Sequence, residues 1–317
     1  MSNSAIGGYF ELELAFGQNY HPDALPLNSA RHCLEYILRA RAYKNIYVPI
    51  YTCNVVRDTI EQLGITYTLY RINQDLEPTE YPVLKENEAF LYTNYFGIKQ
   101  AVVNEVVQRY GSQAIIDNAQ AFYAPPAIGT DTFYSPRKFF GVPDGGFLYT
   151  DCLQNVELEQ DDSQHRVSHL LIRIEQGPEA GYADFCKNSR DLANQPIRLM
   201  SRLTTRLLDS IDYNSARKAR RDNYLYLHEK LKQNNSFNAD IDDMAVPLIY
   251  PYLTNSKTLR KKLIENRIFV ATYWPGLDDR LDETESMLVN QLIPIPIDQR
   301  YTQSDMQKII ETIITHG

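Results

Sequence analysis

Residues 114–149 read AIIDNAQAFYAPPAIGTDTFYSPRKFFGVPDGGFLY, and polar residues separate three short apolar runs within them. The first run ends on Asp117, the second ends on Ser135 with Lys138 soon after, and Asp144-Gly145-Gly146 leads into the third. Runs of this length and composition predict β-strands, so the polar residues lie where strands end and loops begin. In an open α/β sheet, ligands bind at such strand ends. The stretch therefore predicts a ligand site.

Strand and helix patterns alternate through the first half of the chain. This alternation predicts βαβ units and a mostly parallel sheet with helices on both faces. Asn28 or Ser29 is a good N-cap for a helix that follows, because short polar side chains accept hydrogen bonds from the first free N–H groups. We expect strands at 6–14 (an edge strand), 45–51, 65–72, 89–95 and 114–117, and helices at 54–63 and 102–110.

The pattern changes after residue 150. Residues 196–231 read as helices, and a weak boundary falls at 209–212. We therefore expect a large α/β domain over 1–210 and a smaller α+β domain over 211–317. In the smaller domain the pattern predicts strands at 247–253, 268–272 and 292–297 and helices at 256–266 and 304–315.

Composition limits the classes of partner. The 317-residue chain has a net charge of −8 and no long basic block, which argues against a nucleic-acid or anionic-membrane surface. Any anionic ligand would need a local pocket of donors. The four cysteines form no CxxC pair, and the first residues lack a charged segment leading into an apolar core. We therefore expect reduced thiols in a cytoplasmic protein without a signal peptide or membrane span.

Several common site motifs are missing from the sequence. The six histidines form no HxxxH or HExxH spacing, so no metal site is expected. Neither GxGxxG, GxxxxGK[ST] nor GxSxG occurs, which removes the main sequence argument for nicotinamide enzymes, nucleotide triphosphatases and α/β-hydrolases.

The remaining acid, serine and lysine suit pyridoxal phosphate (PLP). This cofactor needs a lysine amine for a Schiff base, a carboxylate to keep its pyridine nitrogen protonated, and donors for its phosphate. Lys138 can be the amine, Asp117 the carboxylate, and Ser135 with the helix start at 29–31 the phosphate site. Spacing alone does not establish this, because most lysines after a strand lie at the surface and Asp117 could cap a helix.

The order of these motifs resembles the core signature of the DegT/StrS-type aminotransferases. These are fold type I PLP enzymes, and most of them aminate keto sugars attached to nucleotides. The signature is D117-N-A-Q120, then FYS135-P-R-K138, then D144-G-G. The resemblance covers most of the chain and extends to NSARHCLEYIL (28–38), VPIYTCNVV (48–56), NYFG (94–97), NSR (188–190), KLIENRIFVATYWP (262–275) and LIPIPIDQRYTQSDMQKI (292–309).

The resemblance implies a role for each matching residue. Lys138 forms the Schiff base and moves the substrate proton, Asp117 pairs with the pyridine nitrogen, and Gln120 lies near the ring's phenolic oxygen. The remaining expected cofactor contacts are Ser29, Ala30, Arg31, Ser135 and Cys53, with Asn188 reaching in from a partner chain. The expected substrate contacts are Tyr9, Asn94, Phe96, Tyr273 and Trp274.

Three positions depart from the family pattern. Cys53 stands where an aromatic residue or histidine usually stacks on the cofactor ring, so stacking falls to Tyr51 or Phe96. Asn94 replaces a common histidine, and Tyr273-Trp274 stands where His-Tyr is frequent. Because Lys138, Asp117 and Ser135 are all present, these departures favour a changed substrate over lost catalysis.

The implied activity is ping-pong amino transfer from a donor, glutamate, to a nucleotide-linked keto sugar for surface polysaccharide or glycan synthesis. A homodimer with a shared active site follows from the same resemblance. Two alternatives stay open: another PLP reaction on this scaffold, such as dehydration or transfer to a non-sugar ketone, and a non-catalytic binding or regulatory protein. Lys138 argues against the sugar dehydratases of this group, which carry histidine there.

Overall fold

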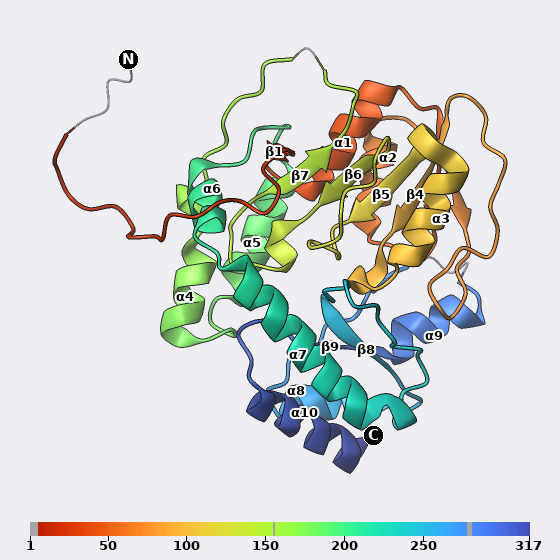
Figure 1. Ribbon diagram of the computed structural model, residues 1–317, viewed down its shortest axis with the longest axis vertical. Coiled ribbons are helices and arrows are strands. Elements are labelled where there is room, and N and C mark those ends of the chain that lie inside the picture. Colours follow the sequence, from red (N-terminus) through yellow and green to blue (C-terminus); the bar gives the residue numbers. More distant parts are fainter. Residues whose placement is uncertain (1–5, 155, 278–280) are drawn as a thin grey trace.

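The structure is a computed structural model that describes residues 6–154, 156–277 and 281–317. A seven-stranded sheet with helices on both faces forms its larger part, and a smaller helical part with two strands lies below it (Figure 1). This confirms the predicted fold class. The strand order is β1-β7-β6-β5-β4-β2-β3. The bounds are β1 Leu25–Leu27, β2 Asn45–Pro49, β3 Thr66–Tyr70, β4 Glu88–Thr93, β5 Ala114–Asn118, β6 Asp131–Tyr134 and β7 Gly146–Tyr149.

Parallel pairing aligns the strand ends that carry the polar residues. β4, β5 and β6 pair in parallel, with Thr93 opposite Asp117 and Asp117 opposite Phe133. β7 runs antiparallel to both of its neighbours, β6 and β1. Every residue of β4, β5 and β6 is buried. Such continuous burial is typical of parallel strands covered on both faces, which explains why they read as apolar runs rather than alternating ones.

Helices cover the two faces of the sheet with separate apolar cores. α1 (Ala30–Arg41) and α2 (Asn54–Gln62) pack into one core, while α3 (Gln100–Tyr110) packs into the other. Ser29 caps α1, because its hydroxyl accepts a hydrogen bond from the His32 N–H at 3.1 Å. The predicted cap is therefore confirmed. Three further helices follow β7: α4 (Ser168–Gln176), α5 (Tyr182–Ala193) and α6 (Arg202–Asp209).

The C-terminal part is built on an antiparallel pair of strands. β8 (Ile249–Leu253) pairs with β9 (Leu292–Pro296), and both are separate from the large sheet. The long helix α7 crosses this region (Figure 1) and precedes it in the chain. The helices here are α7 (Tyr213–Leu231), α8 (Leu259–Glu265), α9 (Glu283–Gln291) and α10 (Gln303–His316).

Two predicted strands are wrong. Residues 6–14 form no strand; they belong to an N-terminal arm that extends away from the body of the protein (Figure 1). Residues 268–272 also form no strand. Both segments have a strand-like composition, but a strand needs a neighbouring backbone for its hydrogen bonds, and composition does not report that neighbour.

The sequence pattern also missed α9. A capping box marks its start, because Asp282 accepts from the Glu285 N–H and Glu285 accepts from the Asp282 N–H. The D-E-T-E spacing of residues 282–285 is a known signal of a helix start and could have revealed it.

Gly146 sets the approach of β7 to the first turn of α1. A Cβ atom on Gly146 would lie 2.4 Å from the Ser29 carbonyl carbon and 2.6 Å from the Ala30 nitrogen. Both contacts are to backbone atoms, which cannot rotate away as a side chain can. Glycine at this position therefore allows the helix start to lie directly against the strand.

We predict that Gly146→Ala lowers the free energy of unfolding by about 2 kcal/mol, because the added methyl group must push α1 away from β7. Gly141→Ala is the matched control, since its Cβ would have its nearest contact at 3.6 Å with a Leu170 side-chain atom. Urea unfolding of both variants measures the difference. Equal stability of the two variants would contradict the close approach.

Candidate active site

Asp117 lies at the end of the central strand β5 and is only 6% exposed. Its Oδ1 accepts a hydrogen bond from the Ala119 N–H at 2.8 Å. Burial raises the pKa of Asp117, while the charge of nearby Lys138 acts in the opposite direction. No cation among the described residues lies within ion-pair distance of this carboxylate. Asp117 is therefore a buried acid whose ionised form needs a cation that the chain does not fix in place.

Lys138 lies on the next strand end. It closes a single 3-10 turn, Pro136–Lys138, that follows β6 and Ser135. Its side chain is exposed, whereas Ser135 is buried. Within the described ranges, no carboxylate forms an ion pair with the Lys138 amine. The amine is therefore available for covalent chemistry next to Asp117.

The first turn of α1 lies beside this loop. Ser29 forms a bridge with Gly145, and the Gly145 N–H donates to the Asn28 carbonyl at 2.8 Å. Gly145 also packs against the ring of Pro136. The free N–H groups of the first helical turn thus lie near Ser135, which is the arrangement that binds phosphate at helix starts. The bridge from Ser29 to Gly145, and the packing of Gly145 on Pro136, connect the helix start at 29–31 to the turn that follows Ser135. Their phosphate contacts stay a prediction.

Gln120 is buried and has one free donor. Its Oε1 accepts from the Phe96 N–H at 3.0 Å, and its Nε2 has no hydrogen-bond partner. Buried polar atoms are almost always satisfied. An unpartnered amide donor next to Asp117 therefore fits a ligand acceptor such as the phenolic oxygen of a pyridoxal ring.

The predicted substrate contacts are only partly brought together. Phe96 stacks on Tyr273 with ring centroids 5.8 Å apart, and Trp274 packs edge-on against Tyr51 at 4.9 Å. The structure does not place Tyr9 with this group, since its side chain lies on the N-terminal arm and is 99% exposed in the single chain, so its substrate contact stays a prediction.

Asn94 is fully buried within the chain. Its Nδ2 donates to Asn118 Oδ1 at 3.1 Å and to Gln100 Oε1 at 3.3 Å, and its Oδ1 accepts from the Lys99 N–H. These bonds hold together the loops that follow β4 and β5. With all of these groups engaged, Asn94 supports the site rather than facing a substrate.

The ring-stacking position stays without an aromatic side chain. Cys53 is half-buried at the start of α2. Tyr51 is fully buried between Tyr95 and Trp274, so it belongs to the core next to the site.

The predicted contact of Asn188 with a partner's cofactor stays a prediction, because the structure contains a single chain. Within this chain Asn188 is 2% exposed, its Nδ2 donates to the Pro143 carbonyl at 2.7 Å, and its Oδ1 has no hydrogen-bond partner. Its position on α5 supports the loop between Lys138 and β7.

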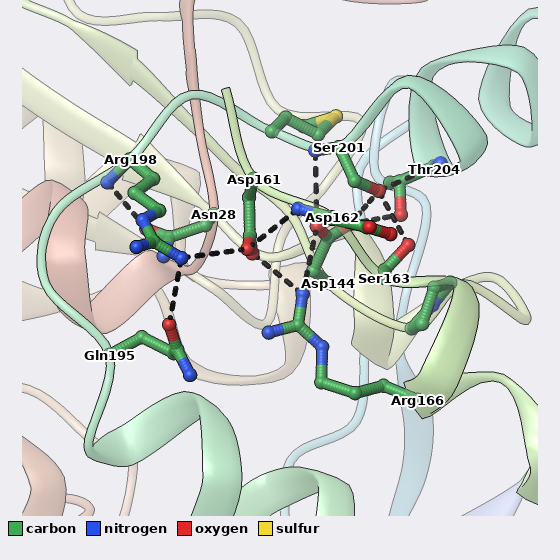
Figure 2. A network of polar contacts seen from close by, with 12 residues as sticks. Asn28, Asp144, Asp161, Asp162, Ser163, Arg166, Gln195, Arg198, Ser201 and Thr204 are labelled. Carbon is green, nitrogen blue, oxygen red and sulfur yellow. Dashed lines mark hydrogen bonds and ion pairs between the residues drawn. The ribbon is translucent and has the colours of Figure 1, made fainter. Parts of the chain in front are cut away.

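A buried ionic network holds the Asp144-Gly145-Gly146 turn, and the sequence did not reveal it. Asp144 is fully buried and accepts hydrogen bonds from the Ser201 N–H at 3.1 Å, the Ser201 hydroxyl at 3.1 Å and the Thr204 hydroxyl. Figure 2 shows Asp161 between the guanidinium groups of Arg166 and Arg198. No motif marks Asp161, Arg166, Arg198, Ser201 or Thr204 in the sequence, so only the Asp144-Gly-Gly signature pointed to the network.

The network also fixes the start of α1. The Asn28 N–H donates to the Arg198 carbonyl at 2.9 Å, and the Arg198 N–H donates to Asn28 Oδ1 at 3.2 Å. The Asn28 amide donates to the Pro196 carbonyl at 3.0 Å. Because Asn28 directly precedes Ser29, these hydrogen bonds connect the ionic network to the start of α1.

We predict that Arg166→Met lowers the free energy of unfolding by about 3 kcal/mol, because it leaves the buried Asp144 without its cation and Asp161 with Arg198 alone. Arg166 lies 2.6 Å from Asp161 and 3.6 Å from Asp144. Arg39→Met is the matched control, since its ion pair with Glu35 lies on a helix surface. Chemical denaturation measures both, and equal small losses would contradict the role of the network.

The described residues contain neither a metal-binding cluster nor a membrane-spanning helix. Within these ranges, no group of three or more His, Cys, Asp or Glu side chains is placed to hold a metal ion. No helix in the described part of the chain has the length and apolar character needed to cross a membrane.

Solved structures share this architecture, although no protein-family model and no curated protein matches the chain. The sugar aminotransferase CalS13 from Micromonospora echinospora aligns at a TM-score of 0.63 and 14% identity, covering 93% of this chain and 88% of its own. A DegT DnrJ EryC1 StrS aminotransferase from Brucella abortus aligns at 0.60 and 14% identity, with 93% of this chain and 86% of its own covered. Spr1654 from Streptococcus pneumoniae, in its PLP form, aligns at 0.64 and 14% identity over 95% of this chain and 88% of its own. The chain therefore has the fold type I architecture of the DegT/DnrJ/EryC1/StrS aminotransferases.

Proposed function

We propose that this protein is a PLP-dependent aminotransferase that moves an amino group from glutamate to a nucleotide-linked keto sugar. The observation that carries the proposal is the buried Asp117 carboxylate, which has no fixed cation and lies beside the exposed amine of Lys138. The shared fold with sugar aminotransferases supports the acceptor class. Its product would enter polysaccharide or glycan synthesis.

The residues present fit the cofactor. Asp117 would bind the protonated pyridine nitrogen, and the unpartnered Nε2 of Gln120 would face the phenolic oxygen. Ser135 and the first turn of α1 would hold the phosphate. Bound PLP supplies an electron-accepting ring and an aldehyde that carries the amino group between the two substrates.

The side chains of the chain have distinct tasks in this reaction. Asp117 is held deep in the sheet, where its negative charge favours a protonated nitrogen opposite it. Lys138 supplies the amine and transfers a proton at the substrate carbon, for which it must be neutral for part of the cycle. The Asp144 network keeps the Gly145-Gly146 turn and α1 in register, so the phosphate contacts and Lys138 keep a fixed spacing.

A homodimer is part of the proposal. The exposed Lys138 and the large apolar side chains of the N-terminal arm support it, because a single chain leaves both open to water. Ile6, Tyr9, Phe10 and Phe16 are each more than 90% exposed.

The four cysteines are all free thiols, which supports a cytoplasmic location.

One observation favours a second candidate, a non-sugar ketone as the acceptor. Asn94 occupies a position that borders the sugar pocket in the resembling family, yet here its amide is bound to Asn118 and Gln100. The sugar side of the pocket therefore lacks one of its expected contacts.

We predict that PLP added to the purified protein gives an absorbance band near the visible edge, and that Lys138→Ala abolishes it because no amine remains beside Asp117. Lys187→Ala is the matched control, since Lys187 lies exposed on α5 and pairs with Asp191 at 2.6 Å. Absorbance spectra of the wild type, Lys138→Ala and Lys187→Ala during titration with PLP test this prediction. A band that persists in Lys138→Ala would rule out this lysine.

We further predict that glutamate converts the loaded protein to its pyridoxamine form, and that a nucleotide-linked keto sugar restores the original spectrum. A panel of such sugars and simple 2-keto acids, followed by absorbance and mass spectrometry, tests the acceptor class. Restoration by keto acids but by none of the sugars would favour the second candidate. No response to glutamate, with bleaching by another amino acid, would show that the donor is different.

A further inference from the structure

A cavity of about 670 Å³ opens beside the Lys138 loop, between α4, α5 and the start of α7. Its lining is strongly basic, although the whole chain has a net charge of −8. Asp298 lies among the lining residues and is already bound by Arg300 through two hydrogen bonds of 2.7 and 2.8 Å. The basic lining residues are Arg137, Lys138, Arg173, Arg220 and Arg300.

Arg137 is the unusual member of this group. Its Nη2 donates to the Ser189 hydroxyl at 3.2 Å, and its guanidinium lies 5.9 Å from the centroid of the Phe185 ring. Its Nε is buried and has no hydrogen-bond partner. Among the residues that the structure describes, no carboxylate lies within ion-pair distance of it. Burial lowers the pKa of Arg137 to about 10, which reflects a charge kept away from water.

Two other arginines that line the cavity, Arg220 and Arg300, are satisfied by the chain itself. Arg300 is bound to Asp298. Arg220 donates to the carbonyl oxygens of Phe139 and Leu248 at 3.2 Å each and lies over the Phe139 ring. Arg137 has neither an anion nor a set of carbonyl acceptors, so the difference is specific to it.

A second unpartnered group lines the same cavity. His169 is 7% exposed, and its Nδ1 is buried without a hydrogen-bond partner. Arg173 is an exposed lining residue for which no ion pair occurs within the described ranges. Arg137 and Arg173 therefore both line this cavity without an anionic partner among the described residues, which indicates a site for an acceptor-rich ligand.

We propose that this cavity is a binding site for an oxyanion, a carboxylate or phosphate group, whose principal partner is Arg137. A buried guanidinium without an anion is unfavourable, and an oxyanion supplies both the missing charge and acceptors for its planar fork of N–H groups. Carboxylates and phosphates both match this fork in a bidentate manner.

The neighbouring Lys138 suggests that the oxyanion belongs to a substrate, and this step rests on the proposed function. Two sources have the required chemistry: the carboxylate of the amino donor and a phosphate group of the acceptor. Arg137 directly precedes Lys138 in the chain, so a group held by Arg137 is kept close to the reacting amine.

Calorimetric titration of the PLP-saturated protein with 2-oxoglutarate and, separately, with inorganic pyrophosphate tests the proposal. The variants are Arg137→Met, which keeps the length of the side chain but removes its charge, and Arg202→Met as the matched control on an exposed helix start. Thermal unfolding of each protein, with and without the anion, provides a readout that is independent of catalysis.

We expect the wild type and Arg202→Met to bind at least one anion, and Arg137→Met to bind it at least about 10-fold more weakly, since charge-assisted bonds to one guanidinium are lost. The anion that binds identifies the source. Arg137→Met should keep or raise the Tm of the unliganded protein and lose the rise that the anion causes, because it removes an unpaired buried charge.

Three outcomes would overturn the proposal: no binding of either anion to the wild type, equal binding to Arg137→Met, or a large fall in Tm of that variant, which would give Arg137 a structural role. The test is separable from the proposed function. Anion binding that depends on Arg137 in a protein whose Lys138 forms no PLP band would leave the site intact and remove the aminotransferase assignment.

Discussion

The carboxylate of Asp117, buried at the end of the central strand β5, needs a cation opposite it when it is ionised. Asp117 has one hydrogen bond from the Ala119 N–H and the charge of Lys138 nearby, yet it has no fixed ion pair within the described ranges. Burying an ionised acid without a partner costs several kcal/mol, so the position is stable in its charged form only when a cation lies opposite. A protonated pyridine nitrogen would supply this cation. In the proposed site, Gln120 and Ser135 would contact other parts of the same cofactor.

The fold supplies this arrangement through two kinds of contact. Parallel register of β4, β5 and β6 aligns the ends that carry Asp117 and Ser135 on one edge of the sheet. The close packing of Gly146 on Ser29 then brings the first turn of α1 to the same edge. Asp144, which precedes Gly145-Gly146, is fixed by its hydrogen bonds in the network of Figure 2, and this stabilises the contact between Gly146 and Ser29. The positions of Asp117, Ser135 and the first turn of α1 thus depend on buried groups that lie behind them in the fold.

Local signals in the sequence predicted the parts of the fold that depend on local physics. The buried strands, the Ser29 cap and the residues at the strand ends follow from apolar runs and short polar side chains. The strands predicted at residues 6–14 and 268–272 do not form, because a strand needs a neighbouring strand for its backbone hydrogen bonds and the local sequence does not specify that neighbour. The placement of Asn188 against Pro143 and of Tyr9 on the exposed arm is likewise decided by tertiary packing, which local signals in the sequence do not report. The unpaired state of Arg137 could not be predicted at all, because it is defined by the absence of acceptors in three dimensions.

Borohydride reduction of the PLP-loaded protein, followed by peptide mass spectrometry, tests the central claim most directly. Reduction fixes the cofactor on whichever lysine holds it. The arrangement of Asp117, Ser135 and Lys138 predicts a single pyridoxyl modification on the peptide that contains Lys138, and its loss in Asp117→Ala, where the charge opposite the pyridine nitrogen is gone. Modification of a different lysine, or labelling of Lys138 that is unaffected by Asp117→Ala, would contradict the site described above.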